Sequence, residues 1–193
     1  MKPGFPFRPV ALALAAMLLA SGCQTAVKPL PKPPAPVGKP ERKESYWKDD
    51  GTPGVASIVV MLAEQRAYFY KGDKLVGEAN VSSGKKNFRT PAGDFKVIQK
   101  DKDHVSNLYG DFIDEAGWVV KSNVDTSKDP VPEGATFRGA KMPYFLRFHG
   151  GYGMHAGRVP NYPASHGCVR LPRFMAEHFY SNAVAGTPVT VRE

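Results

Sequence analysis

The sequence is poor in cysteine, in acidic residues and in long apolar runs. Its 193 residues include two cysteines, which allow at most one disulfide bond and exclude a disulfide-rich scaffold. The longest apolar run, residues 10–20, has eleven residues and is too short to cross a bilayer as a stable helix. With 18 acidic against 26 basic residues the net charge is +8, which favours an anionic polymer or lipid head groups as a partner.

The N-terminus has the features of an export signal. Lys2 and Arg8 precede the apolar run, as in a secretory signal peptide. The segment from Ala20 to Cys23 resembles a bacterial lipobox, with alanine in place of the usual leucine. We therefore expect residues 1–22 to be a cleaved signal peptide and Cys23 to carry lipid. The alternative is an ordinary signal peptide that leaves a free thiol at Cys23. Export in either form makes nucleic acid a poor candidate partner.

Residues 23–44 are rich in proline and lysine and contain no aromatic residue. Such a stretch cannot bury enough surface to offset its ordering entropy, so the composition predicts a disordered linker. At roughly 3.1 Å per residue, an extended tether of this length reaches on the order of 60 Å. The alternative is a disordered segment without a role. A globular domain is expected over residues 45–193.

The globular part has the pattern of a mainly β domain. Its short apolar and aromatic runs favour a mixed β-sheet sandwich or barrel-like arrangement with one or two short helices. The expected strands cover residues 57–62, 67–70, 75–81, 93–98, 118–120, 144–148, 152–155 and 187–191, and the expected helix covers residues 172–184. Residues 101–140 are expected to be a loop-rich insert that forms the wall or lid of a cleft, with a plain surface loop as the alternative.

The chemistry is concentrated near the C-terminus, where Ser165-His166-Gly167-Cys168-Val169-Arg170 follows His155 by a short loop. A thiol becomes a strong nucleophile only when a base or a positive field converts it to a thiolate. His155 lies thirteen positions before Cys168 and is the candidate base. The pattern indicates acyl transfer by a cysteine. The alternative is a tight turn around a buried cysteine.

These residues resemble the YkuD-type L,D-transpeptidases. The resemblance rests on Gly153-Met154-His155-Ala156, on the cysteine motif, and on Arg89-Thr90-Pro91-Ala92-Gly93-Asp94-Phe95 upstream. It spans about residues 55 to 193, and differs from the usual family pattern at Ala156, where glycine is common. It implies that Cys168 is the nucleophile and that His155 accepts its proton and returns it to the leaving amine.

Further roles follow for the neighbours of the cysteine. His166 and Gly167 are predicted to belong to the catalytic site, with the N–H groups of Gly167 and Cys168 as oxyanion donors and that of His166 as a further candidate. The alternative prediction for His166 is a structural role. A nearby imidazolium and Arg170 are expected to lower the pKa of the Cys168 thiol.

Substrate binding is assigned to four side chains. Arg170 is expected to hold a substrate carboxylate, and Ser165 to orient a histidine or bind substrate. Tyr152 and His149 complete the set, each with a structural role in a strand as the alternative. His149, His155, His166 and Cys168 offer potential metal ligands, but their spacings match no common zinc signature. No metal or other cofactor is predicted.

The resemblance implies a cell-wall enzyme that forms an acyl-enzyme with a peptidoglycan tetrapeptide stem, releases D-alanine and transfers the peptide to an amine. The acceptor stays open between a second stem, a free D-amino acid and a protein lysine. The alternatives are a cysteine-dependent carboxypeptidase or endopeptidase, and a non-catalytic lipoprotein that binds the wall. Gln24 after the lipidated cysteine favours the periplasmic face of the outer membrane, where wall-synthesis or wall-anchored proteins are possible partners.

Overall fold

The computed structural model describes residues 43–160 and 162–193, in which thirteen strands and one helix form three sheets. The predicted signal peptide, the lipidation site Cys23 and all but the last two residues of the predicted tether lie outside the described residues. Within the described part of the chain, no helix has the length and apolar character needed to cross a membrane.

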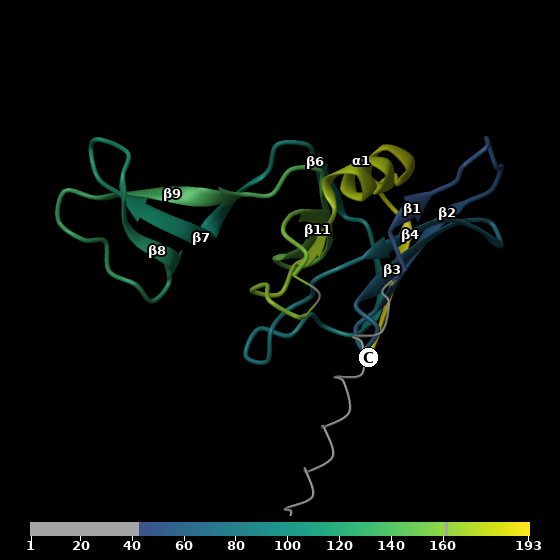
Figure 1. The fold of residues 1–193 in the computed structure, drawn as a ribbon, viewed down its shortest axis with the longest axis horizontal. Coiled ribbons are helices and arrows are strands. Elements are labelled where there is room, and N and C mark those ends of the chain that lie inside the picture. Colours follow the sequence, from purple (N-terminus) through teal and green to yellow (C-terminus); the bar gives the residue numbers. More distant parts are fainter. Residues whose placement is uncertain (1–42, 161) are drawn as a thin grey trace, which may run out of the picture. The chain divides into compact units, whose positions relative to one another are not determined.

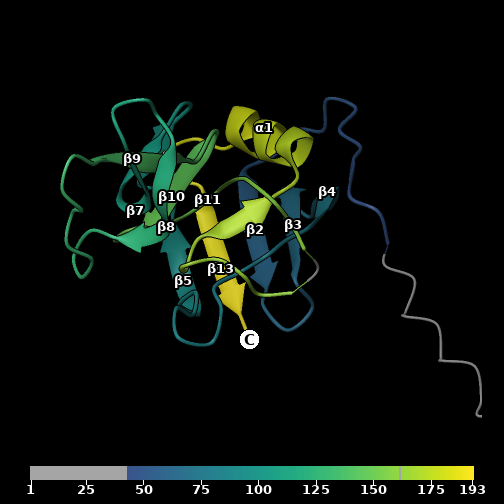
Figure 2. The same cartoon turned by 60° about the vertical axis from the view of Figure 1, so that its left-hand side comes forward.

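The largest sheet has six strands in the order β1-β4-β3-β2-β13-β5. The strands β2, β3 and β4 form an antiparallel meander, and β13 near the C-terminus joins them by pairing in parallel with β2. Figure 2 shows β13 between β2 and β5. The bounds are β1 (Tyr46–Trp47), β2 (Ala56–Met61), β3 (Arg66–Lys71), β4 (Lys74–Asn80), β5 (Gly93–Lys96) and β13 (Pro188–Arg192).

The second sheet has four strands in the order β12-β11-β10-β6. Its bounds are β6 (Gln99–Asp101), β10 (Phe145–His149), β11 (Tyr152–Ala156) and β12 (Val169–Leu171). Helix α1 (Arg173–Asn182) follows β12 and buries Met175, Ala176 and Phe179. Figure 1 shows α1 beside β11. Side chains from these two sheets and the helix share one hydrophobic core.

The third sheet has three strands in the order β8-β7-β9 and is called the wall sheet here. Its strands are β7 (Val105–Ile113), β8 (Val119–Asp125) and β9 (Thr136–Lys141). In Figure 1 they form a group of arrows separate from those of the six-stranded sheet. Two side chains, Phe112 and Val124, are fully buried within it.

The wall sheet corrects the expectation that residues 101–140 are rich in loops. The sequence of these strands does not alternate regularly between apolar and polar residues. The pairing of β7 with β8 and β9 has register shifts, and it requires two glycines. A Cβ atom on Gly110 would lie 2.2 Å from the Arg138 carbonyl oxygen, and one on Gly139 would lie 2.0 Å from that of Ser106. Residues with low strand propensity therefore occupy the points where the backbones approach most closely.

The remaining fold predictions are confirmed. The protein is mainly β with one short helix, and none of the three sheets closes into a barrel. Each predicted strand has a counterpart whose ends differ by one or two residues, except residues 118–120, whose counterpart β8 extends to Asp125. The predicted helix is present in slightly shorter form. Strands β1, β6 and β12 were not predicted, because two or three residues are too few to show a period.

Candidate active site

Two adjacent parallel strands bring the predicted nucleophile and base together. His155 on β11 pairs directly with Arg170 on β12, and Met154 pairs with Val169. Side chains alternate between the two faces of a strand, and Met154 and Val169 are buried in the core. Cys168, which directly precedes β12, therefore emerges on the same face as Arg170 and His155. The thirteen-residue spacing in the sequence becomes a cross-strand neighbourhood in the fold.

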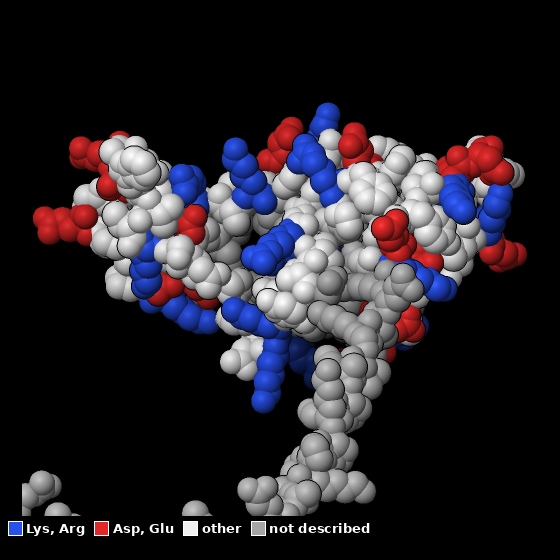
Figure 3. Space-filling view, viewed as in Figure 1, with Lys and Arg blue, Asp and Glu red and all other residues white. Residues whose placement is uncertain are grey.

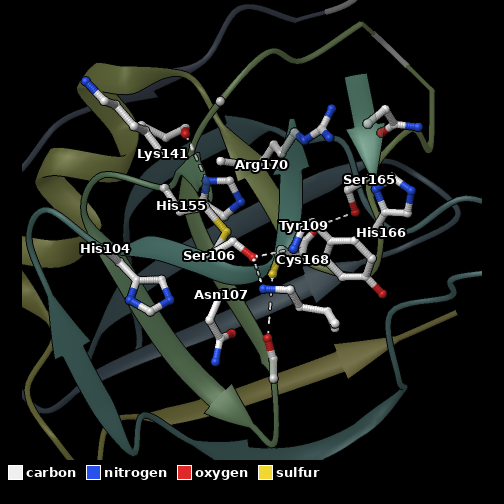
Figure 4. Close-up of a pocket in the computed structure, with 18 of the residues that line it drawn as sticks. His104, Ser106, Asn107, Tyr109, Lys141, His155, Ser165, His166, Cys168 and Arg170 are labelled. Carbon is white, nitrogen blue, oxygen red and sulfur yellow. Dashed lines mark hydrogen bonds between the residues drawn. The ribbon is translucent and has the colours of Figure 1, made fainter. Parts of the chain in front are cut away.

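This face opens into a cavity of about 610 Å³. Cys168, His155, Arg170 and Tyr152 line it from the four-stranded sheet, and residues of all three strands of the wall sheet line it from the other side. Figure 4 shows Tyr109 of β7 among these side chains. The expectation that residues 101–140 form the wall of a cleft is thus confirmed.

His155 is held as a neutral base. Its side chain is buried, and its Nδ1 lies 2.9 Å from the carbonyl oxygen of Ala156. A carbonyl can only accept, so Nδ1 carries the proton and Nε2 keeps its lone pair. Burial lowers the pKa of His155 to about 4, with smaller contributions in the same direction from Arg170 and His104, while the Ala156 carbonyl acts in the opposite direction. At neutral pH the imidazole is therefore ready to accept a proton.

The thiol of Cys168 does not have the low pKa that was expected. Burial raises the pKa of Cys168, and the N–H of Gly153 and the charges of Arg147 and Arg170 offset this only in part. The side chain is half-buried, and Sγ donates weakly to the carbonyl oxygen of Gly151 at 3.8 Å. The expectation was wrong in direction because it counted the cations without the desolvation of the thiolate. A neutral thiol thus faces the same cavity as a neutral imidazole.

The turn before Cys168 is held by two buried hydroxyl groups. Ser165 Oγ donates to the carbonyl oxygen of Cys168 and accepts from the N–H of Gly167 at 3.0 Å. Thr90 Oγ1 donates to the carbonyl oxygen of Gly167 at 2.7 Å and accepts from the N–H of Gly84 at 3.0 Å. Ser165 therefore shapes the turn rather than offering its hydroxyl to substrate. The Gly167 N–H, expected to be an oxyanion donor, is already bonded.

Gly167 is required by both backbone and packing. Its φ of +118° lies where side chains other than glycine are strained, and a Cβ atom would lie 2.5 Å from Cε1 of Tyr152. Tyr152 thus covers the turn and lines the cavity, as predicted for a substrate-binding residue. His149 stacks on the Tyr152 ring at 6.1 Å and packs on Phe95 at 4.9 Å. His149 is exposed and does not line the cavity, although it was predicted to bind substrate.

His166 connects the nucleophile turn to the wall sheet. Its ring stacks on Tyr109 of β7 with centroids 4.6 Å apart, and Phe88 meets it edge-on at 4.5 Å. In Figure 4 the ring lies beyond Tyr109 as seen from Cys168. Burial, followed by the nearby Lys85 ammonium, lowers the pKa of His166. These contacts correspond to the structural alternative considered for this residue.

The cavity is strongly cationic. Its single carboxylate, Asp111, lies 3.5 Å from Arg138. Among the described residues no carboxylate lies within ion-pair distance of Arg170, whose side chain is half-buried. Figure 3 shows several Lys and Arg side chains over the middle and lower part of one face, with Asp and Glu scattered along its upper edge and toward both ends. The four cationic lining residues are Lys141, Arg147, Arg158 and Arg170.

Sequence reasoning missed His104, which also lines the cavity. Its Nδ1 lies 2.9 Å from Oδ2 of Asp101, and its ring stacks on Phe145 at 4.3 Å. The only sequence signal was a carboxylate three residues earlier, which is too common to be specific. Within residues 43–160 and 162–193, no three His, Cys, Asp or Glu side chains are grouped so as to hold a metal ion.

A cysteine and a neutral histidine thus line one cavity, an arrangement that acyl transfer by a cysteine requires. The family described as the YkuD L,D-transpeptidase catalytic domain matches residues 56–191, and the chain belongs to this family. No curated protein matches the chain.

Several solved structures share the fold. An L,D-transpeptidase from Mycobacterium smegmatis is 19% identical with a TM-score of 0.55, over 72% of this chain and 58% of that one. One from Stackebrandtia nassauensis is 19% identical with a TM-score of 0.53, over 76% and 58%. A mutant L,D-transpeptidase of Enterococcus faecium is 24% identical with a TM-score of 0.52, over 72% and 50%. The chain thus spans less than two thirds of the length of these structures.

Proposed function

We propose that this protein is a peptidoglycan L,D-transpeptidase in which Cys168 is the nucleophile and His155 the base. The observation that carries the proposal is the parallel pairing of β11 with β12, which places both side chains on one face above one cavity. Membership of the family whose domain has this activity supports it.

In the donor step, the Cys168 proton passes to Nε2 of His155 as sulfur attacks the amide carbonyl that precedes the terminal D-alanine of a tetrapeptide stem. The tetrahedral intermediate collapses with cleavage of the C–N bond, and His155 returns the proton to the departing amine. The product is a thioester on Cys168. Because the thiol and imidazole both start neutral, proton transfer accompanies the attack instead of preceding it.

In the acceptor step, an amine attacks the thioester, a new amide forms, and the C–S bond breaks. One amide replaces another, so the reaction needs no external energy source. Water as the acceptor gives a carboxypeptidase. With the Gly167 N–H bonded to Ser165, the backbone N–H groups of Cys168 and His166 remain as the candidate oxyanion donors.

The charge of the cavity favours an anionic donor peptide. Arg170 offers a planar fork of donors suited to a carboxylate, and it has no acidic partner among the described residues. We therefore assign the binding of a donor carboxylate to Arg170. The variant Arg170→Gln is expected to raise the KM for the donor about tenfold, the effect of losing one charge-assisted hydrogen bond. Lys86→Gln, at an exposed cation outside the cavity lining, is the matched control.

The central experiment is the intact mass of the full-length protein after mixing with a tetrapeptide stem. We expect an adduct on Cys168, release of D-alanine, and cross-linked dimers. Cys168→Ala should abolish all three, whereas Cys23→Ser should leave all three in place, which assigns the adduct to one of the two thiols.

The alternatives predict different products. Shortened monomers alone would identify a hydrolase with the same acyl-enzyme. Binding of stem peptide without adduct or D-alanine release, equal in the unaltered protein and in Cys168→Ala, would identify a wall-binding protein and contradict the proposal.

We also propose that the protein is a lipoprotein anchored through Cys23 on the periplasmic face of the outer membrane, with residues 24–44 as the arm that reaches the wall. The lipobox-like segment and the Pro/Lys-rich composition support this. Metabolic labelling with a radioactive fatty acid should label the protein and not Cys23→Ser. If the unaltered protein takes up no label and is recovered in the soluble fraction, the proposed lipid anchor is contradicted.

A further inference from the structure

One histidine of the cavity lining, His104, is paired with a carboxylate and has no part in the donor step. His104 lies in the turn between β6 and β7, and Asp101 is the last residue of β6. In Figure 4, His104 and His166 lie on opposite sides of Cys168. The two rings thus border different ends of one cavity, and only His104 has a carboxylate partner.

The His104 ring is held in one orientation. Nδ1 contacts Asp101 at 2.9 Å, and the ring stacks on the fully buried Phe145 at 4.3 Å with an interplanar angle of 17°. The backbone carbonyl oxygen of His104 accepts from the N–H of Met142 at 2.8 Å. The carboxylate makes Nδ1 the protonated nitrogen, so Nε2 keeps a lone pair. The side chain of His104 is 18% exposed and that of Asp101 is 39% exposed, so the pair can exchange protons with water.

The acceptor step requires a base that the donor pair does not supply. An alkylamine acceptor is an ammonium ion at neutral pH and must lose two protons to become an amide nitrogen. The departing Cys168 thiolate takes one of them, relayed by His155. The second proton needs another acceptor. Burial lowers the pKa of His155 to about 4, so this imidazole is a poor base for an ammonium ion. His155 also already relays the first proton to Cys168.

Charged side chains of both signs lie near His104. Arg147 lies over the Phe145 ring on which His104 stacks, and Lys141 pairs with Val105, the residue after His104, while Asp101 places a carboxylate directly behind the imidazole. On the same turn, Lys102 and Asp103 are exposed and of opposite charge. Asp101 is therefore the counter-charge that an acceptor ammonium would meet at His104.

We propose that His104, oriented by Asp101, is the general base for the acyl acceptor, an inference that rests on the proposed transpeptidase function. Nε2 takes one proton from the acceptor ammonium and passes it to water. The neutral amine attacks the thioester, the C–N bond forms, the C–S bond breaks, and the second amine proton ends on the sulfur of Cys168. His155 thus relays the proton of Cys168 in both half-reactions, and His104 takes the additional proton of the acceptor.

The test compares two acceptors in the full-length His104→Gln variant. A D-amino acid is an ammonium ion at neutral pH, whereas hydroxylamine is a neutral nucleophile that needs no prior deprotonation. We expect transfer to the D-amino acid to fall about 100-fold, the usual size of a general-base effect, with transfer to hydroxylamine unchanged. Acylation by the stem peptide, measured by intact mass, should also be unchanged, so the acyl-enzyme accumulates.

Two further variants complete the design. Asp101→Asn keeps the imidazole but removes the carboxylate, and should reduce transfer to the D-amino acid about tenfold with the same selectivity between acceptors. Asp103→Asn removes an exposed carboxylate of the same turn that lies outside the cavity lining, and should behave as the unaltered protein.

An equal loss with both acceptors in His104→Gln would mean a structural role and overturn the inference, as would full transfer to the D-amino acid. Loss of the stem-peptide adduct in His104→Gln alone would assign His104 to the donor step and also overturn it. Failure of the unaltered protein to form any adduct would instead contradict the proposed function itself, so the two failures are distinguishable.

Discussion

The shared core and the wall sheet are stabilised in different ways. The six-stranded and four-stranded sheets, with α1, enclose one cluster of fully buried side chains that includes Phe69, Val60 and Phe179. The wall sheet encloses only Phe112 and Val124 completely, and its strands approach closely through glycines. Trp118, Val119, Val120 and Val131 remain exposed on or beside it.

The shared core therefore contributes the stability of the fold, and the wall sheet contributes the part of the cavity that can determine substrate specificity. The strands that carry Cys168 and His155 belong to the shared core, which keeps their relative positions rigid. The wall sheet contributes the opposite side of the cavity from a part of the chain with little apolar burial. Regions with few buried contacts open locally at lower free energy, so the cavity has one fixed side and one adaptable side.

The largest effect on stability is expected for Phe69→Ala. Phe69 is fully buried and packs against the rings of Trp47 at 5.2 Å and Phe179 at 5.1 Å. Loss of this side chain should lower the free energy of unfolding by about 4 kcal/mol, as for large-to-small changes in other cores. Urea unfolding measures it, with Phe174→Ala at an exposed position of α1 as the control. A similar loss in both variants would contradict the assignment of the core.

The next effect is a loss of stability in acid caused by His155. Its pKa is about 4 in the folded protein and 6.5 when exposed, so the unfolded chain binds more protons between these values. Stability is therefore complete above pH 6.5 and declines as the pH falls to about 4, by up to about 3 kcal/mol. Urea midpoints across this range should decline less steeply for His155→Gln. Parallel curves for the two proteins would refute the burial of a neutral imidazole.

A smaller global effect, with a local signature, is expected for Phe112→Ala. Phe112 packs on Phe137 at 6.2 Å within the wall sheet, away from the shared core. Removal should speed amide hydrogen exchange in β7, β8 and β9 while changing the global free energy of unfolding by less than about 1 kcal/mol. Equal acceleration in β2 and β3 would show that the two regions unfold together and would remove the distinction between them.

The smallest effect is expected for Trp118→Ser. Trp118 is 74% exposed, so the free energy of unfolding should change by no more than about 0.5 kcal/mol. The variant also leaves Trp47 as the sole tryptophan, whose fluorescence then reports on the shared core during urea unfolding. A large destabilisation would mean that the exposed apolar side chains of the wall sheet contribute more than their burial indicates.

Local signals in the sequence predicted the shared core better than the wall sheet. Ala56–Met61 is a short, mainly apolar run rich in β-branched side chains, and in Pro188–Arg192 valine alternates with polar residues, so both strands can be predicted without their partners. Strands β7 and β9 carry glycine and polar residues because of how closely they approach each other, and this requirement exists only in the pair.

The site divides in a similar way. Cys168, His155 and Arg170 were predicted from motifs and their spacing and Tyr152 without a motif, and the fold gathers all four around one cavity. The structural use of the Ser165 hydroxyl depends on the geometry of a turn, which residue types alone do not specify. His104 enters the cavity from the turn before the wall sheet, and no motif links it to the cysteine.

The sequence by itself determined which reactive groups the protein has, which longer segments of the shared core are strands or helix, and which family it belongs to, because these depend on residue type and local spacing. The tertiary structure decided the protonation of Cys168 and His155, the bonded state of the Gly167 N–H, and the presence of His104 at the cavity. These properties depend on desolvation and on neighbours from distant segments, and both arise only when the sheets pack together.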